Sequence, residues 1–255
     1  MSSLQASSPP IPESAQQTLR KYLKQLRPKL EAHIEGVILY GSLVRGEYVE
    51  GHSNINLLLV VNEPTLELLQ HCGHLTEKWQ RQGVVPPLVL TEQELCQSVE
   101  YFPLEYFEIK DNHLLLEGRD PLETLHVNDH YLLLQCLQEL HGNLFRVRQR
   151  FIEGFGNSEA IRALLPLSLT ALLPCLRGLC RVFGQASGGT SEAFLRNLPH
   201  TLQVENPVFL EVLEAKQGLR SPGRLAWPGL FQEYVRGLEE IITCVRENQQ
   251  RLSNS

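Results

Sequence analysis

Two short polar motifs, each next to an apolar run, could together hold a phosphorylated ligand. Gly41 and Ser42 follow the run 37–40, and Arg45 comes three residues later. A glycine lets the backbone approach a phosphate closely, and the first N–H groups of a helix attract anions. The serine hydroxyl adds a donor, and the arginine could add a charge-assisted hydrogen bond to the same phosphates. Taken alone, a Gly-Ser after a strand is more often an ordinary turn than a phosphate site.

The second motif contains two asparagines, Asn54 and Asn56, at the entry to the apolar run 57–61. Alternate residues of a strand point to the same face, so both amides are expected to face one pocket. An amide oxygen can bind a hard cation, but it carries no charge, whereas a carboxylate supplies both an oxygen ligand and a charge. The pair therefore predicts a site that holds divalent metal poorly.

The segments that must position these motifs predict a small α/β domain over residues 14–120. Continuous apolar runs, typical of strands covered on both faces, predict strands over 34–40 and 55–61. Pro86 and Pro87 restrict a third strand to an edge or a bulged position. A further helix is expected to begin at Thr91, because Glu94 three residues later predicts a capping box. The other elements expected here are strands over 84–90 and 113–118 and helices over 14–30, 64–81 and 103–110.

A helical bundle is expected over residues 121–255, because apolar residues recur there at helical spacing. The fold class is therefore α+β, with a small mixed-sheet domain followed by an all-helical domain. Residues 1–13 are polar and rich in Ser and Pro, and they are expected to form a disordered tail. The helices expected in the bundle cover 127–151, 158–183, 191–198, 205–217 and 230–252.

Composition narrows the functional classes. The chain has 255 residues and a formal charge of −6. This net negative charge argues against general nucleic-acid binding, although it leaves room for a local basic patch. Its 6 cysteines include no CxxC pair and no His/Cys cluster at zinc spacing, which favours a reducing compartment. No apolar leader is visible, and the longest apolar stretch, 163–176, is too short to span a bilayer. We therefore expect a cytoplasmic protein with no membrane partner, and we leave homo-oligomerisation open.

The whole arrangement resembles a known family. Gly41-Ser42-x-x-Arg45-Gly46, followed by Ser53-Asn54-x-Asn56, is similar to the motif of the nucleotidyltransferase superfamily, in particular its aminoglycoside and minimal nucleotidyltransferases. The segments 102–118 and 138–149 also look like these proteins, so the resemblance covers most of residues 30–155. It implies nucleotide binding through Gly41, Ser42 and Arg45. Members of the family use divalent metal to move a nucleoside monophosphate from a triphosphate to a hydroxyl group.

The chain departs from the family at the metal motif. The family has Asp-x-Asp where this sequence has Asn54 and Asn56, and the expected strand over 84–90 contains no third acid. The leading hypothesis is a catalytically defective homologue with no catalytic residues and no metal site. It either retains a nucleoside triphosphate as ligand or serves only as a scaffold.

Two alternatives remain. One is a weakly active, metal-dependent transferase supported by glutamates outside the usual positions, the only case in which magnesium is expected. The other is a non-catalytic, oligomeric interaction scaffold in which the pocket is vestigial. The glutamates that could support activity are Glu47, Glu50, Glu92 and Glu94.

Overall fold

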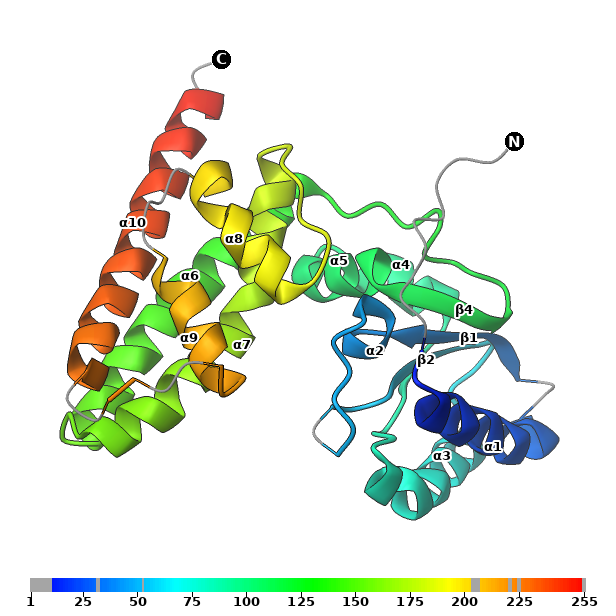
Figure 1. Ribbon diagram of the computed structural model, residues 1–255. Coiled ribbons are helices and arrows are strands. Elements are labelled where there is room, and N and C mark those ends of the chain that lie inside the picture. The colour runs from blue at the N-terminus through cyan, green and yellow to red at the C-terminus, as the bar shows by residue number, and fades with distance from the viewer. Residues whose placement is uncertain are drawn as a thin grey trace. The chain divides into compact units, whose positions relative to one another are not determined.

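The computed structural model describes residues 11–30, 33–51, 53–202, 207–219, 222–223 and 226–253 (Figure 1). Contacts divide the chain into two compact units, Met1–Val127 and Asn128–Ser255. The division falls later than residue 120, because the segment after the sheet packs within the first unit. Leu122, Leu125 and Val127 are buried, and Lys110 Nζ donates to the Leu125 carbonyl at 2.5 Å. Residues 1–10 of the expected tail lie outside the described residues.

The first unit contains a four-stranded mixed sheet with strand order β3-β2-β1-β4. Strand β1 is antiparallel to both β2 and β4, whereas β2 and β3 are parallel. A mixed sheet with helices, followed by helices alone, confirms the predicted fold class. In chain order the elements are α1 Glu13–Leu30, β1 Ile34–Tyr40, α2 Ser42–Arg45, β2 Asn56–Val61, α3 Leu66–Trp79, a 3₁₀ turn Gln80–Gln82, β3 Leu88–Leu90, α4 Glu92–Ser98, α5 Pro103–Asp111 and β4 His113–Gly118.

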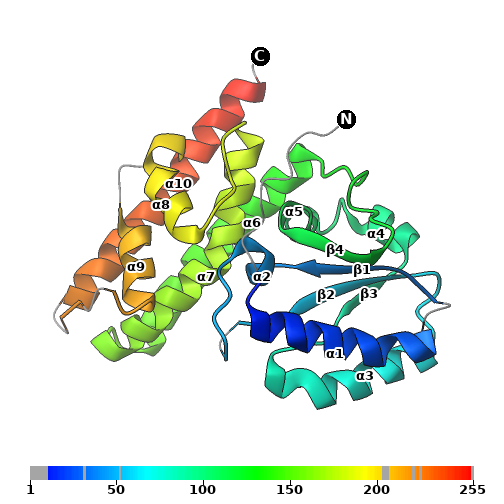
Figure 2. The same ribbon diagram turned by 45° about the vertical axis from the view of Figure 1, so that its right-hand side comes forward.

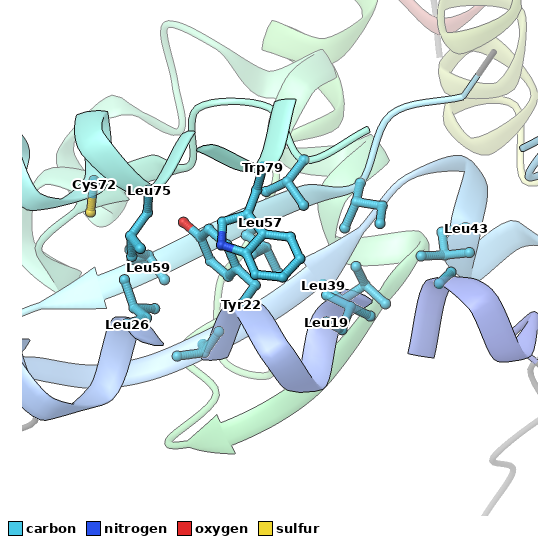
Figure 3. Close-up of a cluster of buried hydrophobic side chains, with 14 of the residues drawn as sticks. Leu19, Tyr22, Leu26, Leu39, Leu43, Leu57, Leu59, Cys72, Leu75 and Trp79 are labelled. Carbon is cyan, nitrogen blue, oxygen red and sulfur yellow. The ribbon is translucent and has the colours of Figure 1, made fainter. Parts of the chain in front are cut away.

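The helices cover the two faces of this sheet. Helices α1 and α3 lie on one face, and α4 and α5 lie on the other (Figure 2). Because side chains alternate along a strand, Leu39 and Leu59 pack on the α1 and α3 side. Helix α1 presents Tyr22 and Leu26, both fully buried, to the same cluster, and Figure 3 shows Tyr22 beside Trp79 of α3 and Leu26 near Leu59. Burial in this cluster also raises the pKa of the Tyr22 hydroxyl.

Local sequence signals set most of the element boundaries, with two differences. The capping box at Thr91 is confirmed, because its Oγ1 accepts from Glu94 N at 3.1 Å while Glu94 Oε2 accepts from Thr91 N at 2.8 Å. Helix α3 begins after Thr65, whose hydroxyl accepts from Leu68 N, and not at Pro64 as the sequence suggested. Strand β3 is shorter than expected, because Pro86 and Pro87 precede it and cannot donate ladder hydrogen bonds.

In the part of the second unit that the structure describes, all regular secondary structure is helical. Helix α7 continues through Pro166 and Pro174, and the Thr170 hydroxyl donates to the Pro166 carbonyl at 2.8 Å. A buried polar cluster joins three helices, because Ser168 Oγ lies 2.7 Å from Asn143 Oδ1 and 2.9 Å from the Tyr234 hydroxyl. The helices are α6 Asp129–Glu153, α7 Ser158–Val182, α8 Ser191–Leu202, α9 Val208–Lys216 and α10 Trp227–Ser253.

Helix α7 contains the apolar stretch 163–176. Among the described residues it alone is long and apolar enough to cross a membrane by length and composition. However, 61% of its most apolar window is buried inside the protein. A mostly buried helix of this kind is typical of the core of a soluble domain.

The buried thiol Cys72 gives the first unit a testable pH dependence. Burial raises the pKa of this thiol from 9.0 to about 11. Between these two values the unfolded chain loses a proton that the folded chain keeps, so the stabilising contribution is complete below pH 9 and declines as pH rises toward 11. We expect the free energy of unfolding to fall by roughly 1 kcal/mol between pH 8 and pH 10 from this group.

Urea unfolding in a reducing buffer, followed by fluorescence of Trp79 in a Trp227→Phe background, measures this effect. Cys72→Ala is the matched control, because it removes the titrating group from the same core position. In the variant, the free energy of unfolding is expected to fall less between pH 8 and pH 10, because the contribution of the Cys72 thiol is absent. Equal declines in the variant and the natural protein would contradict the prediction.

Candidate functional site

The turn between β1 and α2 requires a glycine. Gly41 has φ +88°, a backbone conformation that side chains with a Cβ rarely adopt. Its N–H donates to the Asn112 carbonyl at 3.0 Å, and its carbonyl accepts from Val44 N and Arg45 N, both at 3.1 Å. A Cβ at this position would lie only 3.1 Å from Asn56 Nδ2. The turn is therefore fixed from both sides, and Asn56 packs directly against it.

The first two backbone amides after this turn are unpaired among the described residues, although Leu43 is buried, with 1% of its surface exposed. The N–H groups of Ser42 and Leu43 make no hydrogen bond with any residue that the structure describes. Ser42 is half-buried, and its side chain stands at the start of the same turn. The Ser42 N–H, next to the glycine, is therefore the unpaired backbone donor of this turn that an anionic oxygen could reach.

Strand pairing brings the asparagine motif to this turn. In the antiparallel β1–β2 ladder Tyr40 pairs with Asn56, so the end of β1 and the start of β2 meet at one edge of the sheet. Ile55 is fully buried and bridges Val84, which leaves Asn54 and Asn56 on the opposite side of the backbone. Asn56 is half-buried and Asn54 is exposed. Neither amide side chain hydrogen-bonds to another of the described residues.

Arg45 makes contacts that the sequence did not indicate. Its Nη2 lies 2.5 Å from Glu108 Oε2, its Nε donates to Asn112 Oδ1 at 3.2 Å, and its Nη1 is 3.6 Å from Glu47 Oε2. Only 13% of its side chain is exposed. Arg45 therefore ties α2 to α5 through an internal ion pair. The partners Glu108 and Asn112 were missed, since an acid and an amide four residues apart on a helix carry no local sign of a partner elsewhere in the chain.

The four glutamates considered as substitute ligands are all engaged elsewhere. Glu47 faces Arg45, and Glu50 accepts from the Ser14 hydroxyl at 3.3 Å. Glu92 pairs with Arg119 at 2.5 Å, and Glu94 belongs to the capping box of α4.

Sheet topology separates two of these acids from the glycine turn. Strand β3 runs parallel to β2, and its last residue, Leu90, pairs with Val60. Asn56 lies at the other end of β2, beside Gly41. Glu92 and Glu94 follow directly after β3, so they lie at the opposite end of the sheet from the turn.

The side chains at the turn do not fit a pair of divalent metal ions. Two-metal catalysis needs carboxylates that neutralise and bridge the ions, and Asn54 and Asn56 supply only neutral oxygens. Across the described part of the chain, no group of three His, Cys, Asp or Glu side chains is arranged to hold a metal. The site can offer hydrogen-bond donors to phosphate oxygens, but it lacks the negative charge that would hold magnesium between them.

Comparison with known proteins supports the fold of the first unit. Residues 17–116 match the family model described as a nucleotidyltransferase domain. Among solved structures, the spectinomycin adenyltransferase AAD(9) from Enterococcus faecialis, crystallised with ATP and spectinomycin, aligns with a TM-score of 0.50 and 13% sequence identity. The alignment covers 91% of this chain and 99% of that chain, and at this identity the likeness is one of fold. No curated protein matches the sequence significantly.

Proposed function

Residues 17–116 of this chain belong to the nucleotidyltransferase superfamily, and we propose that the protein has lost metal-dependent nucleotidyl transfer while retaining a site for a nucleoside triphosphate. The observation that carries the proposal is the pair of neutral amides, Asn54 and Asn56, which stands beside the glycine turn, while the carboxylates near α2, Glu47 and Glu108, are paired with Arg45.

Loss of transfer follows from electrostatics. In a two-metal mechanism the ions activate the attacking hydroxyl and stabilise the leaving pyrophosphate, and anionic ligands hold them in place. Two amides in place of two carboxylates remove about two negative charges from the position of two dications. Glu47 and Glu108 share the positive charge of Arg45, so they are poorly placed to substitute.

Retention of nucleotide binding rests on the backbone. Gly41 keeps the positive φ that opens the turn, and the N–H of the half-buried Ser42 has no partner among the described residues, so it can donate to a phosphate oxygen. In this proposal Arg45 holds α2 in place through Glu108 and Asn112 and does not itself clamp the phosphates. Without a metal requirement, ATP binds with or without magnesium.

Calorimetry with ATP tests the proposal directly. We expect binding whose affinity changes less than threefold when magnesium is replaced by EDTA, together with no release of pyrophosphate. The acceptors offered include spectinomycin, because the structural relative is a spectinomycin adenyltransferase. Gly41→Val is the control, since a branched side chain at φ +88° beside Asn56 Nδ2 closes the turn and should abolish binding.

Two outcomes would overturn parts of the proposal. Magnesium-dependent release of pyrophosphate would show a working transferase, the rival enzymatic hypothesis. Absence of any heat of binding, with Gly41→Val indistinguishable from the natural protein, would favour a scaffold with a vestigial pocket.

We also propose a cytoplasmic location for the protein. The free state of all 6 cysteines supports it.

A further inference from the structure

Helix α1 is basic in an acidic protein. It carries five Lys and Arg residues and one acid, although the whole chain has a formal charge of −6. Its apolar face, with Leu19, Tyr22 and Leu26, is buried in the core of the first unit. That face is therefore unavailable for insertion into a lipid surface, the usual use of a basic amphipathic helix. The positive charge must serve another purpose or remain solvated.

A groove lies between α1 and β4. It consists of two adjoining hollows of about 680 Å³ and 200 Å³, which share Leu23, Arg27 and Glu117 among their lining residues. Ile11 and Leu116 add apolar surface to the larger hollow. Strand β4 is an edge strand with β1 as its single neighbour, and Leu116 is half-buried on the α1 side of the sheet. The groove therefore has an apolar floor that other elements of the unit leave open.

The α1 side of the groove is a row of cations. Arg20, Lys24 and Arg27 all line it, spaced four and three residues apart, so one cation occurs per helical turn. Arg27 pairs with Glu117 across the groove. Arg20 and Lys24 are exposed and form no ion pair within the described ranges. Two cations of the row are therefore available to an incoming anionic group.

We propose that this groove binds an acidic amphipathic helix of a partner protein. Carboxylates of such a helix would face Arg20 and Lys24, and its apolar residues would cover Leu23 and Leu116. Three observations select this occupant. The cation spacing matches carboxylates repeated once per helical turn, the floor is apolar, and the charge is complementary to an acidic segment. An RNA backbone would satisfy the cations but would leave the apolar floor without a partner.

Fluorescence anisotropy with a designed peptide tests this proposal on the full chain. The probe is an 18-residue helical peptide with glutamates spaced four and three residues apart and leucines along the adjacent stripe. We expect saturable binding that weakens as salt is raised. A peptide of the same composition, shuffled so that neither stripe exists, should bind at least tenfold more weakly. The same should hold when the glutamates are replaced by glutamines.

Charge reversal on α1 locates the site. Arg20→Glu with Lys24→Glu should weaken binding of the designed peptide at least tenfold. Lys21→Glu is the matched control, because Lys21 is an exposed cation of the same helix that does not line the groove, and it should change the affinity less than twofold. Leu116→Gln tests the floor and should also weaken binding, with unchanged thermal unfolding showing that the domain is intact.

Three results would overturn the proposal. Equal binding of the designed and shuffled peptides would show non-specific attraction. An effect of Lys21→Glu as large as that of the double reversal would mean that total charge, and not the groove, is responsible. A single-stranded RNA or an anionic phospholipid vesicle that displaces the peptide at lower concentration would identify a different class of ligand. None of these results depends on whether ATP binds.

Discussion

Replacing Arg45 by alanine is expected to lower the free energy of unfolding of the first unit by about 3 kcal/mol. The guanidinium contacts Glu108 Oε2, Asn112 Oδ1 and Glu47 Oε2, and both ends of the Arg45–Glu108 pair are largely buried, with 13% and 18% of the side chains exposed. Glu108 Oε1 is buried and has no hydrogen-bond partner in the described structure. Without Arg45, the whole carboxylate would remain in a poorly solvated position with neither oxygen paired.

Urea unfolding can report this effect from the first unit alone. The chain has 2 tryptophans, of which Trp79 lies on α3 of the first unit and Trp227 on α10 of the second. In a Trp227→Phe background, fluorescence follows the unit that contains Arg45. The midpoint of this signal should move to lower urea concentration, while the slope of the transition stays the same.

Glu108→Gln is the matched variant, because it removes the charge and keeps the shape. It should cost less than Arg45→Ala, since a neutral amide is easier to bury than an unpaired carboxylate. Adding Glu108→Gln to Arg45→Ala should recover part of the lost stability, giving a coupling of roughly 1–2 kcal/mol in the double-mutant cycle. Additive losses would mean that the two side chains do not interact as the structure indicates. Normal stability in Arg45→Ala would return Arg45 to the set of residues available for phosphate contact.

Restoring both acids, Asn54→Asp with Asn56→Asp, is expected to make ATP binding depend on magnesium by at least tenfold. Asn56 lies against Gly41, and Asn54 stands on the same side of the chain, so two carboxylates there would face the glycine turn. With magnesium they supply the anionic ligands that a dication needs beside a triphosphate. Without magnesium they repel the triphosphate, so the affinity of the variant should fall below that of the natural protein.

Calorimetry with ATP in magnesium and in EDTA measures both directions of this change. The single variants separate the two positions, and we expect Asn56→Asp to have the larger effect, because Asn56 is the half-buried residue in contact with the turn. Gln70→Glu on the exposed surface of α3 is the control for an added charge elsewhere in the unit. If the double variant binds ATP as the natural protein does under both conditions, the asparagine pair does not face the bound nucleotide.

Patterns within a few residues of one another determined the elements and the frame of the site. The apolar run 34–40 became β1 with the expected bounds, and Thr91 with Glu94 formed the capping box. The asparagine pair at the start of β2 was also readable, because strand alternation and the neutrality of an amide are local properties. These features need no partner from elsewhere in the chain, so sequence alone was sufficient to predict them.

Tertiary structure decided which charged side chains the site can use. The parallel pairing of β3 with β2 placed Glu92 at the far end of the sheet from the glycine turn, and the packing of α5 brought Glu108 and Asn112 onto Arg45. The groove between α1 and β4 likewise joins residues about 90 positions apart, as in the pair Arg27–Glu117. Side chains so far apart in the chain meet only after the sheet has formed. The local sequence around a charged residue does not indicate which distant residue it will pair with. The sequence could therefore show that Asn54 and Asn56 carry no charge, whereas only the fold could show which partners the nearby glutamates pair with.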